Sequence, residues 1–135
     1  MQAKLSKDFA KQIFDILKKE YPKVKPALVY SNPFELLIST ILSAQCTDER
    51  VNIVTKELFK KYKKPQDFIN LSQEQLEKEI FSTGFYKQKA KSIKACCDEL
   101  IKNHNGKVPA DFDELVKLSG VGRKTASVIA GNAFG

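Results

Sequence analysis

The residues best suited to chemistry are the glycine-rich turn at 118–124, LSGVGRK, and the lysine that ends it. Gly120 and Gly122 permit positive φ and let another backbone come close. The N–H groups of such a turn and of the helix after it converge on an anion, so the run predicts a phosphate-binding hairpin. Arg123 adds a cation, and Val121 should pack inward. An ordinary connection between two helices is the alternative.

Lys124 falls in the first turn of the helix expected after the glycines. The positive end of the helix dipole, the neighbouring Arg123 and any burial each disfavour its ammonium form. A neutral amine is the nucleophile that attacks carbon and forms a Schiff base. A lysine that binds phosphate as a point charge fits the position equally well, so the residues alone leave both roles open.

Two further segments carry side chains suited to contact DNA bases. In TGFYKQKA at 83–90, Phe85 and Tyr86 lie in a basic turn with Lys87, where aromatic rings wedge between bases or stack on them. In LSAQCTD at 42–48, Gln45 follows an apolar run and is placed to hydrogen-bond a base or fill a gap in a duplex. Core packing of the rings and solvent exposure of the amide are the alternatives.

The net charge of +7 is concentrated in two stretches. Residues 82–97 hold four lysines and no acid, and residues 115–135 hold two lysines, one arginine and no acid. These stretches account for the whole excess, and the rest of the chain is neutral. Concentrated positive charge predicts a polyanionic partner such as nucleic acid, and a lysine-rich solvated surface is the alternative.

The composition argues against a wholly disordered chain, a membrane-spanning protein and a chain with a signal peptide. Hydrophobic residues make up 42% of the chain, which is enough for one packed core. No apolar run approaches the ~20 residues of a membrane span, and the N-terminus lacks an apolar signal-peptide segment. The cysteines (Cys46, Cys96 and Cys97) and the single His104 lack metal-ligand spacing, so we expect no metal site and a reducing, cytoplasmic compartment.

Helical spacing of apolar residues recurs along the sequence and strand signals are nearly absent, which predicts an all-α fold of about eight helices. Ser6 is placed to cap the first helix, and Pro33 to open an apolar, central one. Ser72 and Gln75 form a capping box. The later helices are expected over about 49–62, 65–71, 73–81, 86–103, 111–118 and 123–133. A proline-marked linker that runs to Asn32 separates segments 1–32 and 33–135.

Taken together, four segments resemble the endonuclease III family, within the helix-hairpin-helix superfamily of DNA glycosylases. They are LSAQCTD at 42–48, TGFYKQKA at 83–90, NGKVPADFDEL at 105–115 and LSGVGRKTA at 118–126, in the order and spacing of that family. The resemblance runs from about Phe34 to Gly135. The lysine-bearing hairpin combined with the SAQ-x-TD segment is highly specific, and either alone would be less so.

The resemblance implies a two-lobed, all-α enzyme that binds duplex DNA, extrudes a damaged pyrimidine and removes it. In the family, the residue matching Lys124 attacks the sugar C1′, and the imine that forms allows β-elimination at the abasic site. Gln45 matches the residue that fills the space left by the extruded nucleotide, and Phe85 matches an apolar wedge. Gly120 and Gly122 match the phosphate-binding turn.

Two departures from the family pattern carry expectations of their own. Ser119 stands where the family usually has proline, which we expect to loosen the turn slightly. The family places an essential Asp, and then four cysteines for a [4Fe–4S] cluster, after the position equivalent to Gly135. We therefore expect 33–135 to be a nearly complete six-helix lobe and 1–32 to belong to a second lobe. We also expect the chain itself to hold no cofactor and to have weak or no glycosylase activity.

The expected partner is double-stranded DNA with damaged pyrimidines or abasic sites. We expect the protein to be a monomer and to have no membrane partner. The residues expected to contact DNA are Gln45, Phe85, Tyr86, Lys87, Gly120, Val121, Gly122 and Arg123, with Lys124 catalytic. A non-catalytic helix-hairpin-helix module is one alternative, since it needs the glycines but not the lysine. A protein-binding helical domain is another, and it predicts no salt-dependent DNA affinity. An adenine-specific relative would usually carry serine at position 124.

Overall fold

The computed structural model describes residues 28–134, and every regular element among them is helical. In chain order the α-helices are α2 (Pro33–Leu42), α3 (Asp48–Lys61), α4 (Pro65–Ile69), α5 (Gln73–Ile80), α6 (Tyr86–His104), α7 (Phe112–Val116) and α8 (Arg123–Ile129). A 3-10 turn, η1 (Phe81–Thr83), follows α5, and a π-helical segment, η2 (Ala130–Phe134), continues α8. The all-α expectation is confirmed for this part. The helix expected from Ser6 lies outside it, and the division between 32 and 33 stays a prediction.

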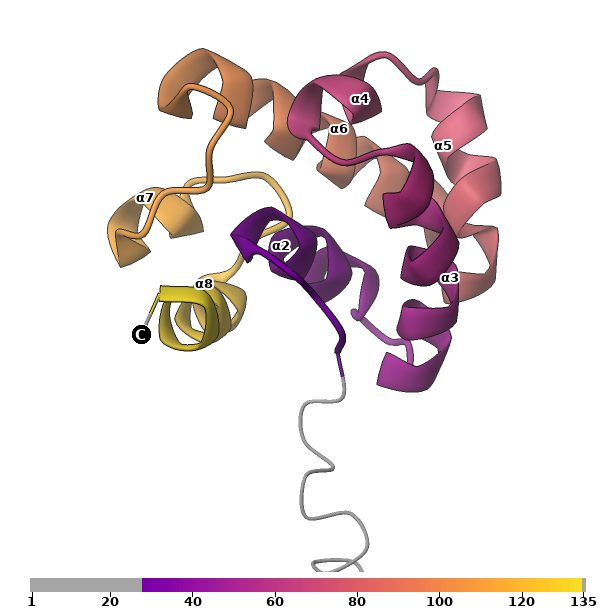
Figure 1. The fold of residues 1–135 in the computed structure, drawn as a ribbon, viewed down its shortest axis with the longest axis horizontal. Coiled ribbons are helices and arrows are strands. Elements are labelled where there is room, and N and C mark those ends of the chain that lie inside the picture. The colour runs from indigo at the N-terminus through magenta and orange to yellow at the C-terminus, as the bar shows by residue number, and fades with distance from the viewer. Residues whose placement is uncertain (1–27, 135) are drawn as a thin grey trace, which may run out of the picture.

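Helix α2 is the centre of the fold. Most of its residues are buried, and Leu37, Ile38 and Leu42 have no exposed surface. Pro33 occupies the first turn, as expected, and the side chain of Asn32 caps the helix by accepting from the N–H of Glu35 at 2.9 Å. In Figure 1, α2 lies between the α7–α8 pair and the group formed by α3, α4 and α5. A helix that is apolar on most sides is stable here because neighbours cover it all round.

Local capping fixes most of the helix boundaries. The expected capping box forms, with the N–H of Gln75 donating to Ser72 Oγ at 3.0 Å and the N–H of Ser72 donating to Gln75 Oε1 at 2.9 Å. Thr47 caps α3 and Asp111 caps α7 by one bond each, accepting from the N–H of Arg50 and of Glu114. Each cap satisfies an N–H group that the first helical turn leaves without a partner. These helices therefore begin where the sequence predicts.

The last two helices are shorter than expected. Helix α7 ends at Val116, and the N–H groups of Lys117 and Leu118 donate to the carbonyls of Glu114 and Leu115 three residues back. Helix α8 passes into η2 after Ile129. The tightened last turn of α7 is a common helix ending, and it leads the chain into the glycine turn before α8. Within residues 28–134, no helix combines the length and apolar character that crossing a membrane requires.

Candidate nucleic-acid interface and nucleophile

The turn between α7 and α8 lies directly against α6. Gly120 adopts φ +80°, and a Cβ at this position would lie 3.0 Å from the Cβ of Ser92 on α6 and 3.5 Å from Ile41. Val121 is 6% exposed and packs into the core, as expected. Both the left-handed backbone and the lack of space require glycine at 120. The turn therefore has one fixed position relative to α2 and α6.

Ser119 fastens the same turn through a carboxylate on α6. Its N–H donates to Glu99 Oε1 at 2.8 Å, and its hydroxyl donates to Glu99 Oε2 at 2.7 Å. Hydrogen bonds to an ionised acceptor are shorter and stronger than neutral ones. The expectation that Ser119 loosens the turn is therefore wrong, because serine supplies two ties to α6 that proline, without an N–H or a hydroxyl, cannot make.

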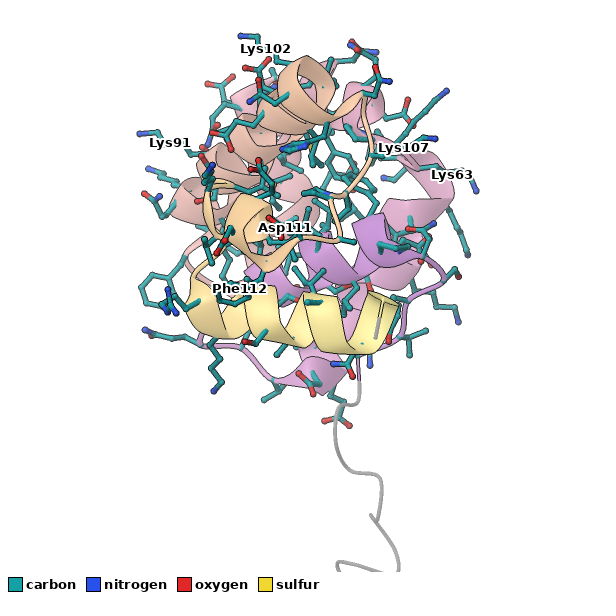
Figure 2. All side chains as sticks on the ribbon, turned by 90° about the vertical axis from the view of Figure 1, so that its left-hand side faces the viewer. Lys63, Lys91, Lys102, Lys107, Asp111 and Phe112 are labelled. Atoms are coloured by element: carbon teal, nitrogen blue, oxygen red, sulfur yellow. The ribbon has the colours of Figure 1, made fainter. Side chains whose placement is uncertain are left out.

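The start of α8 presents an anion-binding geometry to solvent. Gly122 is the N-cap and has no side chain to bond the first-turn N–H groups, which leaves them available to an anion. Arg123 and Lys124 are both exposed. The guanidinium of Arg123 lies 5.3 Å from the ring centre of Phe112, a residue that Figure 2 labels beside α8. This cation–π contact holds Arg123 at the hairpin. Burial, one of the three effects expected to act on the Lys124 amine, is not seen here.

Gln45 and Phe85 share an unusual backbone conformation. Gln45, in the loop after α2, has φ +52°, and Phe85, the N-cap of α6, has φ +47°. Left-handed conformations are uncommon for residues other than glycine and are strained for a bulky side chain. Both side chains are nonetheless exposed, and Phe85 keeps 64% of its surface accessible. An exposed phenylalanine on a strained backbone is not explained by packing, which makes a role in binding the better interpretation.

A single hollow brings these residues together with the hairpin. Its volume is about 240 Å³. The residues that line it are Ile41, Ala44, Gln45, Phe85, Gln88, Lys89, Ser92 and Gly120. Three segments distant in sequence thus meet at one place: the loop after α2, the start of α6 and the turn before α8. The exposed amide, the exposed ring and the lysine-bearing hairpin therefore share one face.

Tyr86 and Lys87 take different positions from each other. Tyr86 is half-buried, packs against the core and contacts Phe81 in a tilted arrangement with ring centres 4.7 Å apart. Core packing, one of the two interpretations left open for this ring, therefore accounts for much of its surface. Lys87 is exposed, and its carbonyl accepts from the side chain of Gln73 at 3.1 Å. Of this pair, Lys87 is the one free to meet a phosphate.

Two of the four lysines in the 82–97 stretch are not part of a basic surface. Lys89 is 4% exposed, and its Nζ donates to the carbonyls of Leu42 at 2.8 Å and Thr83 at 2.9 Å. Lys94 is half-buried and donates to carbonyls at the end of α4. Only part of the positive charge in this stretch is therefore available to a partner. Lys87 and Lys91 are its exposed cations.

The helical spacing of α6 contains the signal for the buried lysine. Lys89 shares a face with Ile93, Cys96, Cys97 and Leu100, all of which are buried. Residues three or four apart lie on the same face of a helix, so Lys89 continues the apolar stripe by one turn. A count of charges along the sequence cannot see this, because it treats every lysine as solvated. Burial lowers the pKa of Lys89 from its ordinary value, and the nearby Cys46 acts in the opposite direction.

The cysteines of the described residues do not fit an iron–sulfur cluster. Cys96 and Cys97 are fully buried in the core, and burial raises the pKa of Cys96 to about 12 and that of Cys97 still further. A cluster needs four deprotonated thiols, and these two are held as thiols. No group of three potential metal ligands occurs among residues 28–134. The cysteines of α6 act as small apolar core residues.

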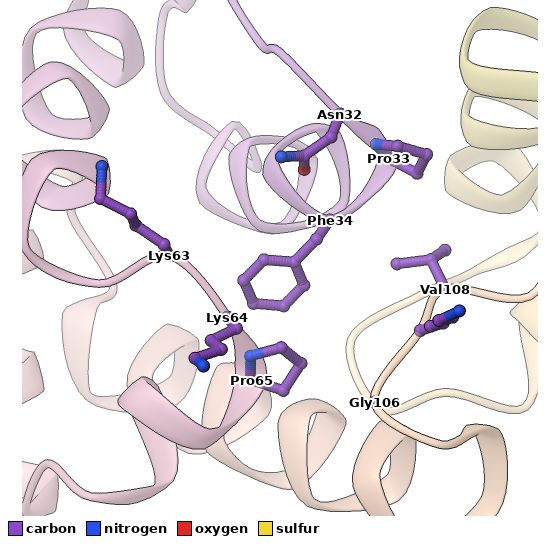
Figure 3. Close-up of a pocket in the computed structure, with 9 residues that line it drawn as sticks. Asn32, Pro33, Phe34, Lys63, Lys64, Pro65, Gly106 and Val108 are labelled. Atoms are coloured by element: carbon purple, nitrogen blue, oxygen red, sulfur yellow. The ribbon is translucent and has the colours of Figure 1, made fainter.

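A larger hollow lies at the opposite end of α2 and contains none of the candidate residues. It has a volume of about 350 Å³. Figure 3 shows Phe34 pointing into it, with Lys63 and Lys64 on one side and Val108 on the other. The ten residues of α2 span about 15 Å, so this hollow and Gln45 lie at opposite ends of that helix. Lys107 also lines it, and Figure 2 shows that lysine on the same side as Lys63.

Comparison with known proteins shows which family the chain belongs to. Residues 38–131 match the family described as HhH-GPD superfamily base excision DNA repair protein. The chain is 52% identical over 115 residues to endonuclease III of Bacillus subtilis (strain 168), an alignment that covers 85% of this chain and 52% of that relative.

Two solved structures of endonuclease III share the fold. One is a non-covalent complex with DNA, and the other is a trapped covalent intermediate with DNA that contains an estranged adenine. Each has a TM-score of 0.82 and 49% identity, and each comparison covers 99% of this chain. The chain spans 61% and 62% of those two proteins. It is thus similar to somewhat more than half of each relative.

Proposed function

Because the chain belongs to the HhH-GPD superfamily of base excision DNA repair proteins, and within it to the endonuclease III family, we propose that it carries the DNA-binding face and the nucleophile of a DNA glycosylase and abasic-site lyase. The substrate on this proposal is duplex DNA with an oxidised pyrimidine or an abasic site. The observation that carries it is the common hollow of Gln45, Phe85 and the Gly120 turn, four residues before Lys124.

DNA binding begins at the phosphates. The uncapped N-terminus of α8 and the Gly120–Gly122 turn receive one phosphate, and Arg123 and Lys87 add exposed cations. Backbone contacts of this kind fix the register of the protein on the duplex without reading its sequence. The turn is suited to this role because two hydrogen bonds from Ser119 to Glu99 hold it against α6 before DNA arrives.

Lesion recognition then requires that a nucleotide leave the base stack. Phe85 inserts as an apolar wedge, and the amide of Gln45 occupies the space of the extruded nucleotide and hydrogen-bonds the base opposite. A damaged or missing base lowers the cost of unstacking, so the same wedge favours lesions over intact DNA. Two exposed side chains on strained backbones are consistent with this use, because strain of this kind gathers at functional sites.

The chemistry belongs to Lys124. At an abasic site its amine, once it has lost a proton to solvent, adds to C1′ of the open sugar aldehyde, and loss of water gives an imine. The imine makes the C2′ proton acidic, and transfer of that proton to solvent breaks the bond from C3′ to its phosphate oxygen. The strand is then nicked, and water hydrolyses the imine to restore the amine. At a damaged nucleotide the same attack on C1′ expels the base. Weak glycosylase activity of the 135-residue polypeptide remains a prediction from the resemblance.

Strand cleavage tests this proposal. A duplex with one abasic site and a 5′-labelled strand is incubated with the wild-type polypeptide, Lys124→Gln and Lys117→Gln. Lys117 is an exposed lysine of the same hairpin that pairs with Glu114, so its variant is the charge-matched control. We expect wild type and Lys117→Gln to give the β-elimination product and Lys124→Gln to give none. Equal binding by all three without cleavage would instead favour the non-catalytic DNA-binding module.

A further inference from the structure

The buried ammonium of Lys89 joins the two segments that carry the exposed side chains. One of its acceptors, Leu42, is the last residue of α2 and precedes Gln45 by three residues. The other acceptor, Thr83, precedes Phe85 by two residues. The two hydrogen bonds, at 2.8 and 2.9 Å, therefore span from one segment to the other through a single atom.

Lys89 is also bound to the second segment through its backbone. Its N–H donates to the carbonyl of Phe85 at 3.0 Å in the first turn of α6. The side chain also lines the same hollow as Gln45 and Phe85. Lys89 thus contacts the Phe85 segment twice and the Gln45 segment once.

An apolar residue would serve this position better if packing were its whole purpose. A buried charge is costly to desolvate, and Lys89 is 96% buried with carbonyl acceptors in place of a carboxylate. Carbonyls at the C-terminal end of a helix carry partial negative charge, which offsets part of that cost for Leu42. What the ammonium provides, and a methyl group does not, is a fixed distance between two loops.

We propose that Lys89 is a positioning residue for lesion recognition: its ammonium locks the segment of Gln45 to the segment of Phe85, so that both side chains enter the duplex as one unit. This inference rests on the proposed function. Neither left-handed conformation is favourable by itself, and a strained backbone persists when its surroundings hold it in place. Loss of the lock is therefore expected to affect recognition of a lesion and to leave phosphate binding in place.

The experiment compares two duplexes of the same sequence, one undamaged and one with a stable abasic analogue that cannot be cleaved. Affinities are measured for wild type, for Lys89→Met, which keeps the length and apolar stem, and for Lys102→Met. Lys102 is exposed on the same helix and pairs with Asp98, so this control removes an equal charge. We expect Lys89→Met to lower the preference for the abasic duplex at least tenfold, with undamaged binding reduced no more than in the control.

A double-mutant background separates positioning from general stability. In a Gln45→Ala, Phe85→Ala chain the lock has nothing left to position, so adding Lys89→Met should lower the abasic preference no further. An equal loss of preference in both backgrounds, or a parallel loss of affinity for both duplexes, overturns the inference. If Lys89→Met does not fold, Lys89→Gln replaces it. Its shorter amide reaches at most one of the two carbonyls, so a partial loss is expected and an unchanged preference contradicts the lock.

Amide hydrogen exchange distinguishes failure of the inference from failure of the proposed function. In Lys89→Met we expect faster exchange at 43–46 and 83–86 than in wild type, with α3 unchanged. Unchanged exchange in both segments overturns the inference whatever the DNA measurements give. A wild-type chain with no preference for the abasic duplex overturns the proposed function instead.

Discussion

At the scale of single residues, Phe85 combines two features that oppose stability. Its backbone has φ +47°, and its ring keeps 64% of its surface exposed. A left-handed conformation costs a residue with a Cβ about 1–2 kcal/mol, and the exposed ring recovers little of this by burial. The residue preceding it, Gly84, also has a positive φ. Glycine therefore occupies one of the two positive-φ positions of this turn, and phenylalanine occupies the other. Function at the surface is the explanation that accounts for both features of Phe85.

We expect glycine at position 85 to separate stability from recognition. Phe85→Gly removes the strain and the wedge, whereas Phe85→Ala removes the wedge and keeps the strain. We expect the glycine variant to have a free energy of unfolding about 1 kcal/mol above that of the alanine variant. Both should lose preference for an abasic duplex. Urea denaturation followed by circular dichroism measures the first quantity, and a glycine variant less stable than alanine would contradict the strain argument.

The cysteines give a second prediction at this scale. The thiolate is the reactive form, and burial raises the pKa of Cys96 to about 12 and raises that of Cys97 as well. At pH 8 we expect iodoacetamide to modify Cys46 first, and to modify the other two after unfolding. Mass spectrometry of labelled peptides measures this, and equal labelling of all three in the folded protein would contradict their burial.

The same pKa shifts fix the sign of a pH effect on stability. Below about pH 8.5, the ordinary pKa of a cysteine, both the folded and the unfolded chain hold these protons. Above it the unfolded chain loses them first, so it binds fewer protons and stability falls as pH rises toward 12. We expect Cys96→Ala to reduce that slope. A slope unchanged by this substitution would place the alkaline loss of stability elsewhere.

At the scale of elements, the α7–α8 hairpin depends on one of its two glycines for its fold. A Cβ on Gly120 meets Ser92 at 3.0 Å and would hold a left-handed backbone, whereas a Cβ on Gly122 meets nothing within 4 Å. We expect Gly120→Ala to lower the free energy of unfolding by about 1–3 kcal/mol, and Gly122→Ala to change it by less than ~0.5 kcal/mol. Thermal denaturation compares the two variants. Equal effects would mean that the turn does not rest on α6 in this way.

The elements also mark what local sequence can and cannot predict. Pro33, Asn32 and the Ser72–Gln75 pair act within four residues, so sequence reasoning finds the start of α2 and of α5 correctly. The contact from Ser119 to Glu99 and the burial of Lys89 depend on α6 lying beside the hairpin and beside α2. Those contacts are set by tertiary packing. The comparison with the family's proline predicted a looser turn at Ser119, and the count of charges along the sequence did not separate Lys89 from the exposed lysines.

At the scale of the whole molecule, position matters more than net charge. The chain carries a net charge of +7. Lys89 and Lys94 donate their ammonium hydrogen bonds to internal carbonyls. Three further lysines line a hollow away from Gln45: Lys63, Lys64 and Lys107. The cations left at the proposed DNA face are few. Long-range attraction to DNA depends on the total net charge, whereas direct contacts with phosphates depend on the exposed cations around the hairpin.

Salt dependence of DNA affinity tests this distinction. The logarithm of DNA affinity falls linearly with the logarithm of salt concentration, and each phosphate contact makes this negative slope steeper by about 0.9. We expect Arg123→Gln to reduce that slope by about 1 and Lys63→Gln to leave it unchanged, although both variants remove one positive charge. Fluorescence anisotropy with a labelled duplex at several salt concentrations measures both. A matching reduction for Lys63→Gln would show that DNA also covers the hollow at the start of α2.

Covalent trapping is a direct test of whether Lys124 is the nucleophile. The wild-type polypeptide is incubated with an abasic duplex and sodium borohydride, which reduces an imine to a stable amine, and the linked peptide is identified by mass spectrometry. We expect a protein–DNA adduct on Lys124, retained in Lys117→Gln and lost in Lys124→Gln. No adduct with wild type, or an adduct that persists in Lys124→Gln, would contradict it.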